Sequence, residues 1–448
     1  MTHSAFIAGA WRAGALAPFT SKDPATGETV WEGAAAGPDD VRAAFDAARK
    51  AFAGWALAGF ETRRAIAERY GELVKARQDE IGLLIARETG KPLWEARGEA
   101  GAMAAKVGVS ITAYEDRTGR THTETEFGEQ VLDHKPLGVM FVLGPYNFPG
   151  HLPNGHVIPA LLAGNTIVFK PSELTPAVGE LMVKLWDEAG LPAGVLNLVQ
   201  GARDTGAAAL ADPDLDGVLF TGSWATGSMI HKLFAGRTGV QLALEMGGNN
   251  PLVVWNAEDA EAAARIAVLS SYITAGQRCS CARRLIVPAG RDGEAVIEAI
   301  AAAIPKLPIG PYTNDPEPFM GPLISGKAAG GVLQAQDDLI KRGAKAFVEA
   351  ARHQAGEAFV TPGLIGVDGV ETADEEVFGP LLTVRRATNF DEALKLANAT
   401  AYGLSAGLVS DDDDLWAKFW TLSRAGIVNR NRPTTGAAST MPFGGPGQ

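Results

Sequence analysis

Two cysteines of the chain could act as nucleophiles, and they lie close together at Cys279 and Cys281. A thiol with a pKa of about 8.5 is mostly protonated at neutral pH, but a helix terminus or a nearby cation lowers that pKa and activates the sulfur. The alternative is a pair of inert buried thiols, the usual state of cysteine in proteins. Of the seven histidines only His151 and His156 lie close in sequence, so we expect no metal centre.

A carboxylate and an amide stand at two other turns. Glu245 ends an apolar run and precedes the glycines of 247–248, where the backbone must turn tightly. A carboxylate there could act as a general base that activates water, although a helix-capping acid is an equal alternative. Asn147 lies between Pro145 and Pro149, in a loop that the prolines stiffen. Its amide would suit an oxyanion hole, and the alternative is an asparagine that satisfies a turn.

Two further segments have the residue types that hold a dinucleotide. Lys170 and Glu173 follow a predicted parallel strand, at the edge of the sheet where ligands bind. Lys170 would hold a ribose hydroxyl or a phosphate, and Glu173 would bind the adenosine ribose and repel a 2′-phosphate, which favours NAD. Gly222, Ser223 and Gly227 stand where a strand enters a helix, whose N-terminal N–H groups attract phosphate. A solvated loop and a plain strand-to-helix turn are the respective alternatives.

The apolar pattern predicts the elements that position these residues. Helices are expected over 38–52, 61–89 and 94–114, with a stop signal at 90–92. From residue 139 onward, short apolar runs alternate with helical runs, which indicates βαβ units and a parallel sheet. A second alternating series runs from residue 257 to about 428. Strands of the first series are predicted at 139–143, 166–169, 195–199, 218–220 and 241–244.

Length and composition exclude several classes of protein. The chain has 448 residues, 46% of them hydrophobic, which is typical of a folded protein of several domains. A net charge of −12 without a dense basic block argues against nucleic-acid binding. The longest run without polar residues, 136–146, is too short to span a bilayer, and the first residues do not resemble a signal peptide. With only two cysteines, we expect a reducing, cytoplasmic location.

The order of these motifs is more specific than any of them alone. Together with Glu-x-Phe-Gly-Pro and Pro-Phe-Gly-Gly, they occur in the order found in the NAD(P)-dependent aldehyde dehydrogenase superfamily. The chain resembles that superfamily over essentially its whole length. The matching segments are 147–149, 170–173, 220–227, 245–248, 276–279, 376–380 and 442–445.

The resemblance implies an α/β fold with three parts. It implies a Rossmann-like NAD-binding domain over 1–119 and 141–246, a β arm for oligomerisation over 120–140, and an α/β catalytic domain over 247–448. NAD is the implied cofactor, and a small aldehyde is the implied substrate. The implied assembly is a homo-oligomer, without nucleic acid or membrane as a partner.

The resemblance also implies a role for each matching residue. Cys279 matches the nucleophile and Glu245 the general base, while Asn147 and the Cys279 N–H match the oxyanion hole. Glu376 and Phe378 match the residues that hold the nicotinamide ribose. The remaining matches are to adenosine-ribose contacts and to the pyrophosphate segment, namely Lys170, Glu173, Gly222, Ser223 and Gly227.

Three runs, 144–156, 277–284 and 435–440, resemble a narrower group whose substrate is a semialdehyde with two carboxylates. The implied reaction is oxidation to the acid through a thioester on the nucleophilic cysteine. A related enzyme that passes the acyl group to CoA or phosphate stays open, although the carboxylate of Glu-x-Gly-Gly argues against it. An inactive paralogue that only binds NAD or a partner chain also stays open.

A substrate with two carboxylates needs cations in its pocket. The resemblance places Arg432, with Ser439 or Thr440, on the loop that anchors the substrate, where a bidentate pair with a carboxylate is possible. The alternative is that Arg430 and Arg432 are solvated charges.

Members of the superfamily continue beyond Pro-Phe-Gly-Gly, whereas this sequence ends at Gln448, so activity and assembly are expected to depend on what that shorter end provides.

Overall fold

The computed structural model describes residues 4–447, which form two compact units. The first unit contains residues 4–23, 27–89 and 94–245, and the second contains 24–26, 90–93 and 246–447. Each unit is built around its own seven-stranded sheet. The expected α/β fold with parallel sheets is therefore confirmed. Within residues 4–447 no helix is long and apolar enough to cross a membrane.

The sheet of the first unit has the strand order β11-β10-β7-β8-β9-β1-β2. The five strands from β7 to β11 are parallel, and β1 and β2 add an antiparallel edge. β7 and β8 are buried along nearly their whole length, as expected of parallel strands covered on both faces. The strands are β1 (Ala5–Ile7), β2 (Ala10–Arg12), β7 (Val139–Leu143), β8 (Thr166–Lys170), β9 (Leu196–Val199), β10 (Gly217–Thr221) and β11 (Gln241–Glu245).

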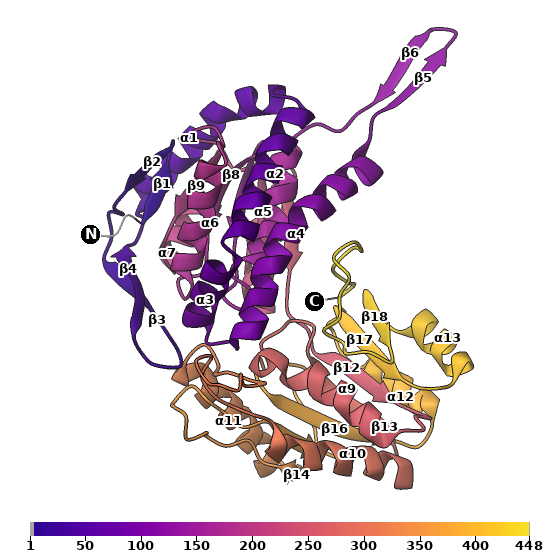
Figure 1. Cartoon of the computed structure of the whole chain (residues 1–448). Helices are drawn as coiled ribbons and strands as arrows, with labels where there is room; N and C mark the ends of the chain where they lie inside the picture. The colour runs from indigo at the N-terminus through magenta and orange to yellow at the C-terminus, as the bar shows by residue number, and fades with distance from the viewer. Residues whose placement is uncertain (1–3, 448) are drawn as a thin grey trace. The chain divides into compact units, whose positions relative to one another are not determined.

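Helices cover both faces of this sheet (Figure 1). α5 and α6 connect β7 to β8 and β8 to β9, so right-handed crossovers place both on one face, while α1 and α7 pack together on the other. α2 and α3 pack against α6. The helices are α1 (Pro38–Leu57), α2 (Phe60–Ala76), α3 (Gln78–Thr89), α4 (Leu93–Thr118), α5 (His151–Leu162), α6 (Pro176–Glu188), α7 (Arg203–Leu210) and α8 (Trp224–Leu233).

One predicted helix is two helices in the structure. The apolar spacing over 61–89 predicts a continuous helix, but the chain leaves helical geometry at Arg77, whose φ is −110° and ψ is 23°. α2 ends at Ala76 and α3 begins at Gln78. On either side of the break, α2 and α3 both pack against α6.

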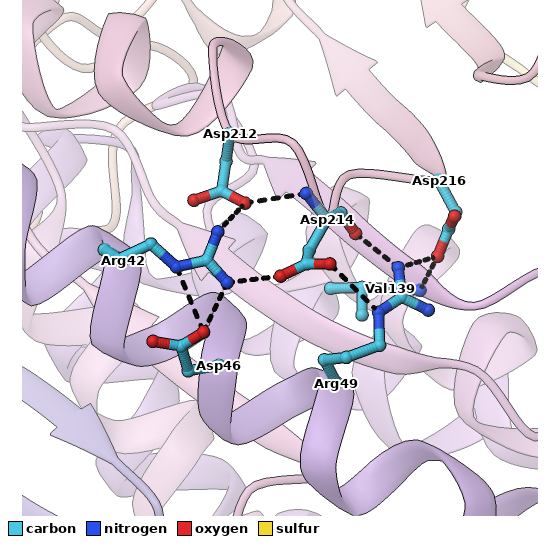
Figure 2. A network of polar contacts seen from close by, with 7 residues as sticks. All are labelled: Arg42, Asp46, Arg49, Val139, Asp212, Asp214 and Asp216. Atoms are coloured by element: carbon cyan, nitrogen blue, oxygen red, sulfur yellow. Dashed lines mark hydrogen bonds and ion pairs between the residues drawn. The ribbon is translucent and has the colours of Figure 1, made fainter.

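Two arginines of α1 meet acidic side chains of the loop before β10, as Figure 2 shows. Arg42 Nη1 lies 2.8 Å from Asp212 Oδ1. Arg49 pairs with Asp216, which also accepts a hydrogen bond of 2.8 Å from the Val139 N–H. Because Val139 begins β7 and Asp216 directly precedes β10, this network fixes the starts of these two neighbouring strands.

A hairpin of the first unit extends away from its helices (Figure 1). It consists of β5 (Thr121–Thr125) and β6 (Gly128–Leu132), which pair antiparallel and are exposed along their whole length. Phe127, at the turn, is 98% exposed. A second small ribbon pairs β3 (Pro18–Lys22) with β4 (Thr29–Ala34).

The second unit has the strand order β14-β15-β16-β13-β12-β17-β18, parallel except for β14. Alternate residues of its central strands face two separate cores, one with α9, α10 and α11 and one with α12 and α13. The strands are β12 (Asn250–Val254), β13 (Ala282–Pro288), β14 (Lys345–Val348), β15 (Gly363–Gly366), β16 (Leu381–Ala387), β17 (Ser405–Val409) and β18 (Ile427–Arg430). The helices are α9 (Ala260–Tyr272), α10 (Arg291–Ala303), α11 (Gly326–Lys341), α12 (Phe390–Ala397) and α13 (Asp413–Leu422).

Candidate active site

The carboxyl ends of four parallel strands lie side by side at one edge of the first unit's sheet. In-register pairing places Glu245 beside Thr221, and the end of β8 at Lys170 beside the end of β7. Strands β7, β8 and β9 follow one another in one direction, whereas β10 and β11 continue in the other. Ligands of open α/β sheets bind where the strand order reverses. That point lies between β7 and β10, which lead into the Asn147 loop and the Gly222 turn.

The loop that carries Asn147 is anchored at both ends. The Gly144 N–H donates to Lys170 O at 3.0 Å, which ties the start of the loop to β8. At its end, the Gly150 N–H donates to Glu99 Oε1 of α4 at 2.9 Å. The side chain of Asn147 itself is buried. A rigid segment therefore presents this amide, which is what an oxyanion-hole donor requires.

Lys170 and Glu173 form a pair just after β8. Lys170 Nζ donates to Pro171 O at 3.0 Å and lies 3.7 Å from Glu173 Oε2. Burial lowers the pKa of Lys170, and the charge of Glu173 opposes that change. The Glu173 side chain is 47% exposed, so its carboxylate is accessible to a ligand. The pair offers a donor and an acceptor at one strand end, as a ribose contact needs.

A buried carboxylate holds the helix that follows this pair. Glu88, at the end of α3, accepts hydrogen bonds from the N–H groups of Ala177 and Val178, both at 2.9 Å. Ser21 Oγ donates to the same carboxyl at 2.6 Å. Burial raises the pKa of Glu88 to about 7, although these three hydrogen bonds oppose the shift. The N-terminus of α6 is thereby fixed to α3 and β3.

The turn after β10 has the features of a phosphate site. The Gly222 N–H donates to Glu245 O at 3.0 Å, which joins this turn to the end of β11. Ser223 caps α8, since its Oγ accepts from the Thr226 N–H at 3.3 Å. The Gly227 N–H donates to Ser223 O at 3.0 Å in the first helical turn. The first N–H groups of a helix have no partner within it, and with the helix dipole they attract an anion.

Glu245 is half-buried at the end of β11, and burial raises the pKa of its carboxyl. A raised pKa makes its carboxylate a stronger base, which suits the activation of water. Its in-register neighbour Thr221 has Oγ1 2.9 Å from His156 Nε2 of α5. Burial, and to a lesser extent Lys106, lower the pKa of His156 to about 4. The imidazole is therefore neutral at pH 7 and does not weaken the base with a positive charge.

Cys279 lies in a tight loop of the second unit, between α9 and β13. Thr274, Ala275 and Gly276 have φ values of 57°, 52° and 71°, in the left-handed region that favours glycine. A Cβ on Gly276 would lie 2.2 Å from Gly379 O, so the backbones approach closely here. Left-handed backbone at residues other than glycine costs about 1–3 kcal/mol each and often marks functional loops.

Two buried amides hold this loop. Gln277 Oε1 accepts from the Ile324 N–H at 2.9 Å. Asn250 Nδ2 donates to the carbonyl oxygen of Cys279 at 2.7 Å and to that of Cys281 at 2.9 Å. Cys281 is fully buried, whereas Cys279 is partly exposed. Of the two thiols, the geometry favours Cys279 as the one that a substrate can reach.

Glu376 and Phe378 lie in the loop before β16. The Glu376 carboxylate accepts a hydrogen bond from the Gly248 N–H, and a Cβ at Gly247 would lie 1.8 Å from its Oε2. Gly247 thus makes room for this carboxylate, and Gly248 donates its N–H to it. Burial raises the pKa of Glu376, and the neighbouring Arg283 and Gly248 oppose the change.

Arg432 and Ser439 are both exposed on the segment after β18. Arg430 pairs with Asp413 of α13 at 2.6 Å. Arg432 pairs with no carboxylate within residues 4–447, and its guanidinium lies against Gly436, where a Cβ would be 2.6 Å from Nη2. Arg430 thus has a structural partner, and Arg432 is available to an anionic ligand.

Comparison with known proteins settles the family. The family described as Aldehyde dehydrogenase family matches residues 11–448. This chain belongs to that family. The resemblance predicted from the motif order is thus confirmed, and the protein is an aldehyde dehydrogenase by descent.

Several relatives of this aldehyde dehydrogenase are similar over nearly their whole length. N-succinylglutamate 5-semialdehyde dehydrogenase 2 of Caulobacter vibrioides is 56% identical over 448 residues, which is 100% of this chain and 92% of the relative. N-succinylglutamate 5-semialdehyde dehydrogenase of Burkholderia pseudomallei is 52% identical over 444 residues, which is 99% of this chain and 91% of the relative. A solved structure of a methylmalonate-semialdehyde dehydrogenase from Sinorhizobium meliloti, complexed with NAD, has a TM-score of 0.93 at 28% identity, covering 100% of this chain and 92% of that one.

The structure groups the candidate residues of this aldehyde dehydrogenase in two sets. At the sheet edge of the first unit lie Asn147, Lys170 and Glu245, together with the Gly222 turn. In the second unit Arg283 contacts both the loop of Cys279, at Arg278 O, and the carboxylate of Glu376. No group of three or more His, Cys, Asp or Glu side chains in the described part of the chain is arranged to hold a metal.

His156 and Arg283 match no motif residue with an implied role, although both lie in the runs that resemble the narrower group. The contact of His156 with Thr221 joins residues 65 positions apart. That of Arg283 with Gly379 joins residues 96 positions apart. In the sequence, each of these two residues is distinguished only as a basic side chain within a run that matches the narrower group.

Proposed function

We propose that this aldehyde dehydrogenase oxidises N-succinylglutamate 5-semialdehyde to N-succinylglutamate with NAD as the hydride acceptor, in arginine degradation by the succinyltransferase pathway. The observation that carries the proposal is an identity of 52% to 56% over 99% to 100% of the chain to relatives named for that substrate. A similar solved structure is complexed with NAD.

The residues at the sheet edge of the first unit fit NAD. The reversal of strand order, the capped N-terminus of α8 and the Lys170–Glu173 pair are the features that a dinucleotide needs. Lys170 and Glu173 would hold the adenosine ribose, and Glu376 and Phe378 the nicotinamide ribose. The pyrophosphate would lie at the turn formed by Gly222, Ser223 and Gly227. When bound, NAD supplies the acceptor for the hydride.

Cys279 provides the covalent step in this proposal. Its thiolate attacks the aldehyde carbon and forms a tetrahedral thiohemiacetal, whose oxyanion is stabilised by the Asn147 amide and the Cys279 N–H. Loss of the hydride from that carbon leaves a thioester on the sulfur. Glu245 then takes a proton from water, the water oxygen attacks the thioester carbon, and the acid leaves with regeneration of the thiolate.

In this proposal, Arg432 determines the substrate specificity of the enzyme. N-succinylglutamate semialdehyde carries two carboxylates, and a guanidinium can hold one of them through two parallel hydrogen bonds. Ser439 or Thr440 would add a neutral donor from the same segment. The exposure of Arg432 and its lack of a carboxylate partner within residues 4–447 support this assignment.

NADH formation with this semialdehyde, measured with and without CoA, tests the proposal. Rapid NADH formation that does not require CoA is expected, because Glu245 makes water the acyl acceptor. The variant Cys279→Ala should lose oxidation but still bind NAD, whereas Cys281→Ala should keep most activity. If NADH formation strictly required CoA, CoA rather than water would be the acyl acceptor. If the chain bound NAD but oxidised no aldehyde, it would be an inactive paralogue.

A second variant separates the two halves of the reaction. Glu245→Gln should keep the hydride step and stall at the thioester, giving a burst of about one NADH per active site before slow turnover. Loss of the burst itself would mean that Glu245 mainly activates the thiol rather than water.

We also propose assembly and location. A homo-oligomer formed through the β5–β6 hairpin is supported by the exposure of Phe127, Val131 and Leu132 on this one element. Two reduced thiols support a cytoplasmic location. Light scattering on the wild type and on Phe127→Ser tests the first point, since the variant should dissociate; an unchanged mass would exclude Phe127 from the interface.

A further inference from the structure

Arg283 of β13 is a buried cation that touches two functional segments of the second unit. Its side chain is 3% exposed. Nη2 donates to Arg278 O at 3.0 Å, the carbonyl directly before Cys279. Nη1 donates to Gly379 O at 3.2 Å, in the Glu-x-Phe-Gly-Pro segment. A single guanidinium thus contacts the loop of the proposed nucleophile and the loop of the proposed ribose ligands.

The same guanidinium also faces the carboxylate of Glu376. Nη2 lies 3.6 Å from Glu376 Oε1, and the guanidinium carbon lies 5.4 Å from the centre of the Phe378 ring. Oε1 is buried and accepts no hydrogen bond from any residue that the structure describes. This oxygen is therefore held by charge rather than by a hydrogen bond.

A rigid element supports Arg283. It lies near the start of β13, and Thr383 Oγ1 of the neighbouring β16 donates to Arg283 O at 2.9 Å. The backbone of Arg283 is thus part of the sheet, whereas the two carbonyl oxygens that its side chain contacts lie in turns. Arg278 O also accepts from the Cys281 N–H at 3.0 Å, and Gly379 O also accepts from the Leu381 N–H at 2.9 Å. A displacement of the guanidinium would therefore change a contact of each loop at once, in addition to the contacts that Gln277 and Asn250 make with the Cys279 loop.

We infer that Arg283 is a positioning residue that couples occupation of Glu376 to the placement of Cys279. A ligand hydroxyl that donates to the Glu376 carboxylate weakens the attraction between that carboxylate and Arg283. The same guanidinium holds the carbonyl before the proposed nucleophile. The inference rests on the proposed function, since it takes Glu376 as a cofactor ligand and Cys279 as the nucleophile. It adds a residue that touches neither the substrate nor the cofactor.

The rate at which iodoacetamide alkylates Cys279, with and without saturating NAD, measures this coupling. Peptide mass spectrometry separates Cys279 from Cys281. In the wild type, NAD should change the rate by about fivefold or more, the lower range of coupling between sites. In Arg283→Lys, which keeps the charge but loses the forked contacts, the rates with and without NAD should differ by less than about twofold.

Arg284→Lys is the matched control. Arg284 is the next residue of β13 and also donates to backbone carbonyls, those of Asn249, Leu396 and Ala397, but it contacts neither loop. This variant should keep the wild-type response to NAD. A loss of response as large as that of Arg283→Lys would mean that general loosening of β13 is the cause, and the inference would be wrong.

A second variant covers the case in which Arg283→Lys does not fold. Glu376→Gln leaves Arg283 in place and removes the charge that it faces, so at saturating NAD it should also lose the response of Cys279. Retention of the response in either variant overturns the coupling. A wild type that oxidises the semialdehyde but reacts with iodoacetamide equally with and without NAD overturns the inference alone, whereas a wild type that forms no NADH overturns the proposed function as well.

Discussion

Replacement of Glu88 by glutamine tests how the first unit holds the start of α6. Glu88 Oε1 accepts from Ser21 Oγ and the Ala177 N–H, and Oε2 accepts from the Val178 N–H. A protonated acid can donate to Ser21 Oγ and still accept from both N–H groups. An amide cannot, because its NH2 must face one of the two N–H groups. Glu88→Gln therefore leaves one buried N–H without its acceptor, which costs about 1–3 kcal/mol of unfolding free energy.

The pH dependence of this effect follows from the pKa of Glu88. Burial raises it from 4.5 to about 7 in the folded chain. Between these pH values the unfolded chain holds fewer protons than the folded chain, so the free energy of unfolding falls as the pH rises. Raising the pH from about 5.5 to about 8 should remove about 2 kcal/mol of stability in the wild type, since one pKa unit corresponds to about 1.4 kcal/mol. Glu88→Gln lacks this titration.

Urea unfolding of both proteins, followed by circular dichroism at several pH values, measures the difference. The advantage of the wild type over Glu88→Gln should shrink by about 2 kcal/mol across this range. Glu72→Gln, which removes an exposed carboxyl of the same unit, controls for the lost charge and should show no such trend. A difference that stays constant with pH, or that grows as the pH rises, would refute the assignment of a raised pKa to Glu88.

Three predictions concern the proposed reaction. Asn147→Ala should lower kcat by about 10²–10³-fold, the usual effect of losing one oxyanion-hole donor, and a change below about threefold in steady-state assays would exclude that role. Glu173→Gln should narrow the preference for NAD over NADP, because the exposed carboxylate repels a 2′-phosphate; equal use of both cofactors by the wild type would contradict this. Arg432→Ala should raise KM for the dianionic semialdehyde by about tenfold or more, since a charge-assisted hydrogen bond contributes roughly 1.5–3 kcal/mol. An uncharged aliphatic aldehyde is the control, and an equal loss for both substrates would assign Arg432 a structural role.

The sequence predicts the parallel strands better than the helix boundaries, for a physical reason. A strand covered on both faces must be a continuous apolar run, so 166–169 identifies β8 (Thr166–Lys170) to within one residue. The break at Arg77 has no such signal, because neither glycine nor proline marks it and both flanking segments keep helical spacing. Both helices pack on α6, and such tertiary contacts are not visible in the spacing of apolar residues.

In the candidate site, too, the sequence predicts some residues and not others. Motif types and order point to Cys279, Glu245 and Asn147, because each chemical role requires a particular side chain after a particular strand. They do not show which residues hold these side chains in place. Arg283 and Glu88 act through contacts with backbone groups distant in sequence, and a backbone carbonyl or N–H has no identity that a pattern of side chains could reveal.

Gly276 and Gln277, which precede Cys279, show that a motif can also contain residues that hold the backbone in place. Thr274 and Ala275 adopt left-handed backbone at a cost of about 1–3 kcal/mol each, so the loop would relax unless its surroundings prevented it. Gln277 opposes that relaxation with three hydrogen bonds to backbone groups, at 3.1, 3.4 and 2.9 Å. At about 1 kcal/mol each, these bonds are comparable to the strain. Gly276 meets a second requirement, since no Cβ fits there. The Gly-Gln pair therefore maintains the strained backbone of the loop that carries the proposed nucleophile. Cys279 alone would not define the site.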